Sequence, residues 1–229
     1  MAKTQMREQF KQYLENFRKK VPQEQQELMN RAIEELEASG VATGLRKGQQ
    51  APDFTLPDAN GKDVSLYEEL KKGPVILTFY RGGWCPYCNM ELRAYQSILD
   101  DIHQAGGQLI AISPQTPDHS LSTKEKNELR FHVLSDVGNK VAQKYNLVYR
   151  LPDYLIDLYK ELGLDVSSYN GDHSWTLPVS ATYIIGQDGK IAFEYTKADY
   201  KDRVEPSEVL DELKKVVAKS SKAEVDGMR

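Results

Sequence analysis

Apolar residues recur at two different spacings along the chain, and the change in spacing separates two structural parts. In residues 4–39 they recur at helical spacing in two stretches, which predicts two amphipathic helices. Pro22 suits the first turn of the second helix, and Gly40 suits the position directly after its end. This helical hairpin either packs on its own domain or forms the interface of a homodimer, since an apolar stripe serves both arrangements.

From residue 44 onward, short strand-like runs alternate with helical stretches. Runs at 54–56 and 64–66 flank Asn60-Gly61, which is a strong signal for a β-hairpin. Residues 75–80 (VILTFY) are apolar on both faces, as is required of a central strand that is covered on both sides. The other expected helices are residues 86–103, a helix opened by Thr116-Pro117, 139–145, 154–162 and 206–219, and the other expected strands are 109–112, 131–134, 183–185 and 191–195.

The order of these elements predicts an α/β protein. A buried strand, a helix with cysteines at its start, further strand–helix units and a final hairpin plus helix are typical of a thioredoxin-like fold, in which helices flank a central mixed sheet. We therefore expect an N-terminal helical hairpin extension (residues 1–43), a thioredoxin-like domain (44–219) and a flexible tail (220–229). Residues 147–175 are less regular, and we interpret them as an insertion.

Composition and charge limit the possible partners and locations. The chain has 229 residues, of which 40% are hydrophobic and 28% charged, as expected of one elaborated globular domain. A net charge of −4 provides no broad attraction to nucleic acid or to an anionic membrane surface. The polar N-terminus does not resemble a signal peptide, and the apolar runs are too short to span a bilayer. We therefore expect a cytoplasmic protein.

The sequence contains two cysteines, Cys85 and Cys88, at the predicted junction of a strand and a helix. A helix N-terminus stabilises a thiolate, which is the nucleophilic form of cysteine. Lowering a thiol pKa of about 8.5 by about two units makes the group mostly thiolate at neutral pH and takes roughly 2.7 kcal/mol, of which a helix end supplies about 0.3–2 kcal/mol. A further cation is therefore expected, and Arg81 is the nearest candidate, with Arg93 the second.

The spacing of the two cysteines suits a redox cycle. We expect Cys85 to be the more exposed sulfur and to attack first, with Cys88 one helical turn deeper. If a peroxide oxidises Cys85 to a sulfenic acid, Cys88 can condense with it into a disulfide. An external dithiol then resets the pair by thiol–disulfide exchange.

Two other interpretations of the cysteine pair compete with catalysis. Half of a zinc site is one, but a structural site needs four ligands, and the four histidines do not have metal-binding spacing. Two inert, buried cysteines are the other. The strand–turn–helix context favours a redox site over both, so we expect no metal and no cofactor.

Several segments around the cysteines form recognisable motifs: residues 48–56 (GQQAPDFTL), 64–66 (VSL), 109–113 (LIAIS), 133–136 (VLSD) and 181–185 (ATYII) with Asp188-Gly189. In these motifs the sequence resembles the alkyl hydroperoxide reductase/thiol-specific antioxidant (AhpC/TSA) family, the peroxiredoxin-like proteins of the thioredoxin-fold superfamily. The resemblance covers about residues 44–219 and implies that Cys85 is the peroxidatic cysteine and Cys88 the resolving one.

The chain also departs from the pattern of that family. Where the family has a proline and a hydroxyl residue before the attacking cysteine, this chain has Thr78 and Gly82, and Ser180 stands near the place of the family's peroxide-contacting arginine. The segment Trp84-Cys85-Pro86-Tyr87-Cys88 instead looks like a thioredoxin or glutaredoxin active site. Pro178 is a candidate for the cis-proline of such folds, although trans is the default.

Two further residues stand just before the last predicted hairpin. His173 and Trp175 either line the pocket of the active site or belong to a surface loop that is anchored by one aromatic side chain.

Three functions are consistent with these features. The first is a peroxidase that reduces hydrogen peroxide or alkyl hydroperoxides and is recycled by thioredoxin or a similar dithiol donor. The second is a protein disulfide oxidoreductase with little peroxidase activity, because the usual peroxide-binding groups are missing. The third is a redox sensor whose N-terminal hairpin binds a partner.

Overall fold

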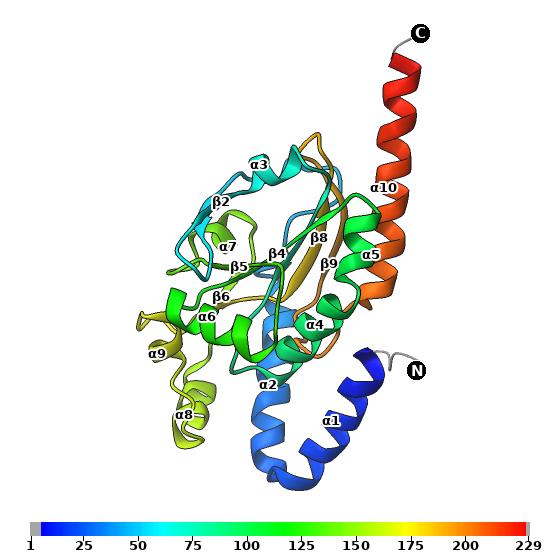
Figure 1. Cartoon of the computed structure of the whole chain (residues 1–229). Coiled ribbons are helices and arrows are strands. Elements are labelled where there is room, and N and C mark those ends of the chain that lie inside the picture. Colours follow the sequence, from blue (N-terminus) through cyan, green and yellow to red (C-terminus); the bar gives the residue numbers. More distant parts are fainter. Residues whose placement is uncertain (1–5, 228–229) are drawn as a thin grey trace.

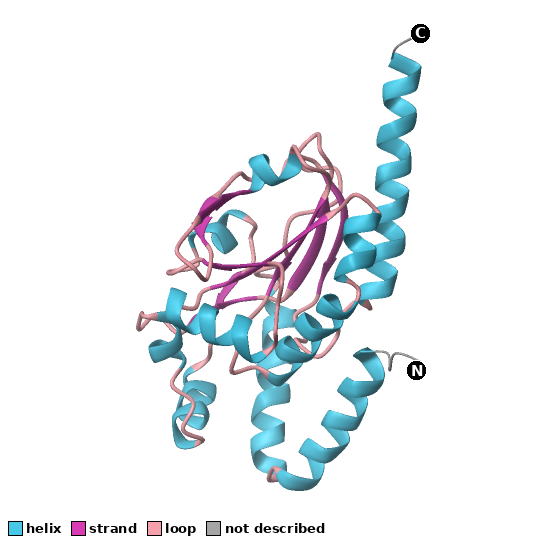
Figure 2. Cartoon of the chain, viewed as in Figure 1, coloured by secondary structure: helices cyan, strands magenta, loops and turns pink. Residues whose placement is uncertain are grey.

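A central sheet organises the computed structural model, which describes residues 6–227 (Figures 1 and 2). Within these residues the sheet has five strands in the order β5-β4-β3-β8-β9. Neighbouring strands β3, β4 and β5 are parallel, whereas β8 is antiparallel to both β3 and β9. The predicted thioredoxin-like α/β fold with a mixed sheet is therefore confirmed. The strands are β3 (Val75–Phe79), β4 (Gln108–Ser113), β5 (His132–Ser135), β8 (Ala181–Ile185) and β9 (Ile191–Thr196).

Both faces of the sheet are covered, because successive side chains of each strand point to opposite sides. On β3, Ile76 belongs to one buried cluster, whereas Leu77 belongs to the other. The first cluster lies under α4 (Pro86–Ser97), α5 (Leu99–Gln104) and α10 (Pro206–Gly227). The second lies under the hairpin of β1 (Thr55–Pro57) and β2 (Asp63–Ser65), with α3 (Leu66–Leu70) and α7 (Lys140–Lys144), while α6 (Pro117–Lys126) packs beside β5.

The insertion is more regular than the sequence indicated. Besides α8 (Asp153–Glu161), which matches the predicted helix, it contains α9 (Val166–Asn170). Its ends form β6 (Val148–Arg150) and β7 (Thr176–Pro178), which pair in antiparallel orientation. These elements surround an apolar cluster of their own, so the insertion is a packed unit beside the central sheet.

The N-terminal hairpin packs on its own domain, which is one of the two arrangements considered above. It consists of α1 (Met6–Lys20) and α2 (Gln23–Ser39), both as predicted. The first helix contacts α4, and the second contacts α8 (Figure 1). The backbone N–H groups of Met6 and Arg7 donate to the carboxylate of Glu205, which fastens the start of α1 to the segment before α10.

Two helices end at positions other than those expected. The single helix predicted for residues 86–103 is broken at Ile98, whose ψ of 13° separates α4 from α5. One residue earlier, the hydroxyl of Ser97 donates to the carbonyl of Ala94 at 2.7 Å, and such back-bonding competes with the helix ladder and bends helices.

The closing helix α10 continues past its predicted end at Lys219 and reaches Gly227. No proline or glycine interrupts residues 207–226, so the sequence contains no strong stop signal before Gly227. Residues 220–227 of the predicted tail thus continue α10, and residues 228–229 lie outside the described part of the chain. Among the helices of residues 6–227, α10 included, none is both long and apolar enough to cross a bilayer.

Candidate active site at Cys85 and Cys88

A sharp turn carries the chain from the end of β3 to the start of α4. Gly82 has a φ of 151°, a conformation that side chains disfavour, and a Cβ there would collide with the ring of Trp84. A Cβ on Gly83 would collide with the hydroxyl of Thr123 on α6. Both glycines therefore let the backbone turn closely, and the helix starts where it was predicted, with Cys85 at the N-cap position and Pro86 as the first helical residue.

The two sulfurs are less accessible than expected. Cys85 is 1% exposed and Cys88 0%, so the prediction of an exposed attacking cysteine is wrong. The cover comes from aromatic residues: Tyr87 stands two residues after Cys85, and Tyr13 of α1 packs edge-on against the ring of Tyr87, with ring centroids 5.2 Å apart. The sequence does not predict this cover, because Tyr13 belongs to the N-terminal hairpin.

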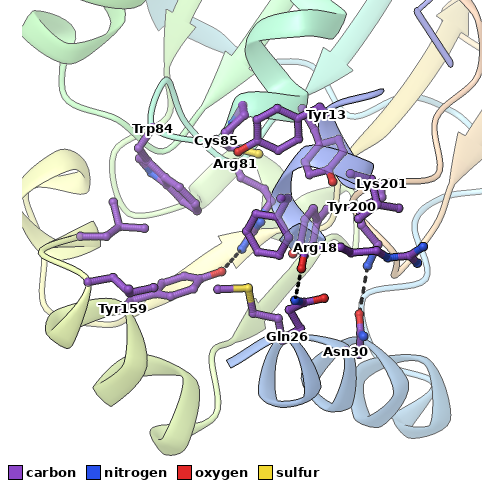
Figure 3. Close-up of a pocket in the computed structure, with 17 residues that line it drawn as sticks. Tyr13, Arg18, Gln26, Asn30, Arg81, Trp84, Cys85, Tyr159, Tyr200 and Lys201 are labelled. Atoms are coloured by element: carbon purple, nitrogen blue, oxygen red, sulfur yellow. Dashed lines mark hydrogen bonds between the residues drawn. The ribbon is translucent and has the colours of Figure 1, made fainter. Parts of the chain in front are cut away.

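The two cysteines nevertheless face different surroundings. A cavity of about 170 Å³ reaches Cys85, which is one of its lining residues, whereas Cys88 is not (Figure 3). A small molecule can therefore approach Cys85, while Cys88 lies behind it in the protein interior. This order matches the expected one, although neither sulfur lies at the surface.

A buried cluster of charges surrounds Cys88. The guanidinium of Arg203, which follows β9, lies with its Nη2 atom 3.6 Å from the sulfur of Cys88 and 2.6 Å from the hydroxyl of Ser180. Its other terminal nitrogen forms an ion pair with Glu91 of α4. All four residues are at most 4% exposed. Arg203 thus reaches Ser180, the place where the family resemblance led us to expect an arginine.

Neither Arg203 nor Glu91 was identified from the sequence. Arg203 stands in a loop that carries no motif, so nothing local predicts its direction. Glu91 did offer a signal, because it is three residues after Cys88 and therefore shares its face of the helix. A charged side chain on a buried helix face requires a partner of opposite charge.

This cluster decides which sulfur carries the negative charge. Burial raises the pKa of Cys85 well above its usual range, and the hydrogen bond to Cys88 adds to the effect. Burial also opposes ionisation of Cys88, but the hydrogen bond from Cys85 and the charges of Arg203 and Arg81 outweigh it and lower the pKa of Cys88. The resting charge therefore lies on Cys88, and the prediction of an ionised Cys85 is corrected for the resting pair.

Arg81 is a second buried cation, on the side of Cys85. Its guanidinium lies over the rings of Trp84 and Tyr200, at 4.8 and 4.2 Å from their centroids, and it donates to the hydroxyl of Tyr159 at 3.0 Å. Among the side chains described in residues 6–220 it has no carboxylate partner, and its Nε atom has no hydrogen-bond partner there. Arg81 favours the thiolate of Cys85, as expected from the sequence. Arg93, the other candidate, is instead bonded to Asn127.

The remaining sequence candidates lie away from the sulfurs. Trp175 is buried in the cluster of the insertion and His173 is exposed, and neither lines the cavity at Cys85. They thus correspond to the surface loop with one anchoring aromatic side chain. Pro178 belongs to β7, and residues 6–227 contain no cis peptide bond. Among the side chains described in residues 6–220, no group of three or more His, Cys, Asp or Glu is arranged to hold a metal ion.

Plant proteins are among the relatives of this chain. Peroxiredoxin Q, chloroplastic, of Populus jackii is 28% identical over 76% of this chain and 68% of the relative. Peroxiredoxin Q, chloroplastic, of Arabidopsis thaliana is 30% identical over 75% of this chain and 66% of the relative. The chain thus spans about two thirds of the length of these relatives.

Solved structures with the same fold include two bacterial proteins. The peroxidoxin BcpB of Mycobacterium tuberculosis superposes with a TM-score of 0.60 at 20% identity, covering 75% of this chain and 98% of that one. A peroxiredoxin-like protein of Aquifex aeolicus gives a TM-score of 0.59 at 16% identity, covering 77% and 90%. At these identities the likeness concerns the fold.

A family model matches the central part of the chain. The AhpC/TSA family model matches residues 47–194, a region that includes the central sheet up to Glu194 of β9, the turn and both cysteines, but neither the N-terminal helical hairpin nor Arg203. This region is more than half of the 229 residues. The resemblance inferred from the sequence motifs is therefore confirmed, and the chain belongs to the AhpC/TSA family.

Proposed function

We propose that this protein is a thiol-dependent peroxidase that reduces hydrogen peroxide or organic hydroperoxides through Cys85 and Cys88. The observation that carries the proposal is the cavity that ends at Cys85, with the buried guanidinium of Arg81 in its wall and the buried Cys88 and Arg203 behind Cys85. Such a site admits a small oxidant and withholds both sulfurs from the protein surface. Relatives with the name peroxiredoxin Q support the same activity.

The first step oxidises Cys85. The proton of Cys85 passes along the hydrogen bond to Cys88, which makes Cys85 the thiolate. Its sulfur attacks one oxygen of the hydroperoxide, an S–O bond forms and the O–O bond breaks. The leaving alkoxide takes up the proton that Cys88 holds and departs as an alcohol, or as water when the substrate is hydrogen peroxide. Cys85 is now a sulfenic acid, and Cys88 is again a thiolate.

The second step forms the disulfide. The thiolate of Cys88 attacks the sulfur of Cys85, the S–S bond forms and hydroxide leaves, to be protonated to water. The peroxide has then gained two electrons from the two thiols. A thioredoxin-like dithiol returns the two electrons and is itself oxidised to a disulfide.

The charges supplied by this chain fit both steps. Arg203 holds negative charge on Cys88, which the second step uses as the nucleophile. Arg81 lies in the wall of the cavity, where it stabilises negative charge on the sulfur of Cys85 and on the leaving oxygen. These two guanidinium groups supply the positive charge that the family's peroxide-contacting arginine would supply near the position of Ser180.

A protein disulfide oxidoreductase is the second candidate, and the segment Trp84-Cys85-Pro86-Tyr87-Cys88 favours it. Exchange with a protein thiol requires an in-line approach to a sulfur atom. With both sulfurs at most 1% exposed, this approach needs a rearrangement of the aromatic cover. The peroxidase needs this rearrangement only when a dithiol reduces its disulfide, and not for binding or reducing its oxidant, so the structure favours it.

The experiment mixes the reduced protein with stoichiometric hydrogen peroxide or cumene hydroperoxide and follows thiol loss by stopped flow. We expect oxidation far faster than that of free cysteine. Cys88→Ser should stop at a sulfenic acid on Cys85 that dimedone traps, while Cys85→Ser should lose peroxide reduction. Oxidation at the rate of free cysteine, together with rapid reduction of insulin disulfides, would establish the oxidoreductase instead.

Reductant, assembly and location are part of this proposal. We propose a thioredoxin-like donor, a cytoplasmic location and, as an open alternative to the monomer, a homodimer. The plant relatives described above are chloroplastic by name. Turnover with purified thioredoxin, light scattering and cell fractionation test the three points in turn.

A further inference from the structure

The outer wall of the cavity at Cys85 is built by the N-terminal hairpin. The family model begins at residue 47, so this wall lies outside the region that the chain shares with the AhpC/TSA family. The hairpin residues that line the cavity are Tyr13, Leu14, Phe17, Arg18, Gln26, Met29 and Asn30.

This wall is fixed to the body of the protein at several points. Phe10 and Tyr13 both pack edge-on against Tyr87, with ring centroids 5.1 and 5.2 Å apart. On the second helix, the carboxylate of Glu35 accepts a hydrogen bond from Tyr154 of α8 at 2.7 Å. The hairpin therefore holds the cavity in shape.

The cavity is larger and less polar than hydrogen peroxide requires. A cavity of about 150 Å³ holds a benzene ring, whereas one water molecule takes about 30 Å³ of liquid volume. At about 170 Å³, the cavity here suits a compact organic group. Phe17 and Met29 of the hairpin, together with Leu164 after α8, offer such a group apolar contacts.

The charged residues of the cavity are all cations. Among the described residues, Arg18, Arg81 and Lys201 line it, and no aspartate or glutamate does. Lys201 is paired with Asp199 at 3.2 Å, but Arg18 has no ion-pair partner among the side chains described in residues 6–220. Figure 3 places Arg18, Lys201 and Asn30 on one side of the cavity, opposite Trp84 and Tyr159. In a chain of net charge −4, this local excess of positive charge favours an anion.

We propose that the N-terminal hairpin completes a substrate site for organic hydroperoxides that carry a carboxylate. The hydroperoxide group lies between Cys85 and Arg81, the apolar body fills the space under Phe17 and Met29, and the carboxylate lies toward Arg18. The hairpin thereby selects the substrate of the peroxidase. This inference rests on the proposed function.

Two probes of the same shape test the charge, and a third tests the size. Cumene hydroperoxide and its para-carboxylate differ in one anionic group, and hydrogen peroxide lacks the organic body. We expect the rate constant for oxidation of Cys85 to be at least tenfold larger for cumene hydroperoxide than for hydrogen peroxide, since one buried methylene contributes about a factor of four. The para-carboxylate should react about three- to fivefold faster still, as expected of an exposed ion pair.

Variants of the hairpin assign these preferences to individual residues. Arg18→Gln should abolish the advantage of the carboxylate, while Lys19→Gln, which removes the neighbouring charge outside the cavity, should keep it. Met29→Trp should fill the cavity and lower the ratio of cumene hydroperoxide to hydrogen peroxide. A wild-type protein without either preference, or ratios that these variants leave unchanged, would overturn the inference.

A binding measurement separates this inference from the proposed function. The unreactive acid 4-isopropylbenzoate should bind to the reduced wild-type protein in a calorimetric titration, and more weakly to Arg18→Gln. Binding without oxidation of Cys85 by any hydroperoxide would refute the peroxidase and keep the anion site. Oxidation by hydrogen peroxide without binding of this acid would refute the site and keep the peroxidase.

Discussion

The buried pair of Arg203 and Glu91 provides the sharpest test of how the thiols are activated. Arg203→Met would remove the cation beside Cys88 and would leave Glu91 buried without its counter-ion. Breaking one side of a buried ion pair is strongly destabilising, whereas replacing both sides is often neutral. The informative variant is therefore the double substitution Glu91→Gln with Arg203→Met, with Glu91→Gln alone as its partner.

The expected magnitude follows from the distance of 3.6 Å between Arg203 and the sulfur of Cys88. At an effective dielectric constant of about 20, two unit charges at this distance attract each other by roughly 4–5 kcal/mol. The carboxylate of Glu91 forms an ion pair with the same guanidinium, and its negative charge offsets part of this attraction. If half remains, about 2 kcal/mol is lost in the double variant, which corresponds to a rise of about 1.5 units in the thiol pKa.

The assay is the pH dependence of alkylation by iodoacetamide, with mass spectrometry to assign the modified cysteine. The midpoint should rise by about 1.5 pH units in the double variant, with a roughly thirtyfold loss of rate below the midpoint. Glu91→Gln alone should keep the midpoint or lower it, because Arg203 then acts without its counter-ion. Arg93→Met, which removes an arginine bonded to Asn127, is the control and should leave the profile unchanged. An unchanged midpoint in the double variant would refute the reasoning.

Three further predictions concern pH, the turn and the second cation. Burial raises the pKa of Glu91 to about 7, so the folded protein keeps a proton that the unfolded chain releases near pH 4.5. The free energy of unfolding, measured by urea titration, should therefore fall by about 3 kcal/mol between pH 4.5 and pH 7. Glu91→Gln should remove this dependence on pH. Gly83→Ala should cost about 1–3 kcal/mol of stability through its clash with Thr123, and adding Thr123→Ala should restore part of it; no recovery would contradict the clash. Arg81→Met should slow oxidation of Cys85 by hydrogen peroxide about tenfold or more at unchanged circular dichroism, and an equal rate would make Arg81 structural.

The sheet and most helices could be predicted because their signals are local. Residues 75–79 are all buried, and a run that is apolar on both faces has few alternatives to a central strand. The pair β6 and β7 was missed for the opposite reason. Each has three residues, one ends in a proline, and 25 residues of the insertion separate them. Such short strands form because tertiary packing brings them together, and the local sequence pattern does not predict that packing.

In the active site, too, residues that are neighbours in sequence could be predicted, whereas residues distant in sequence could not. The turn, the helix start and Arg81 are neighbours in sequence, so the motif predicts them together. Arg203 reaches Glu91 across 112 residues, and its arrival beside Cys88 determines which sulfur is charged. The cover over Cys85 likewise comes from α1, whose apolar stripe was compatible with two arrangements. A C-x-x-C motif at a helix start thus specifies the distance between two sulfurs, whereas their ionisation and access depend on side chains that only the folded chain brings near.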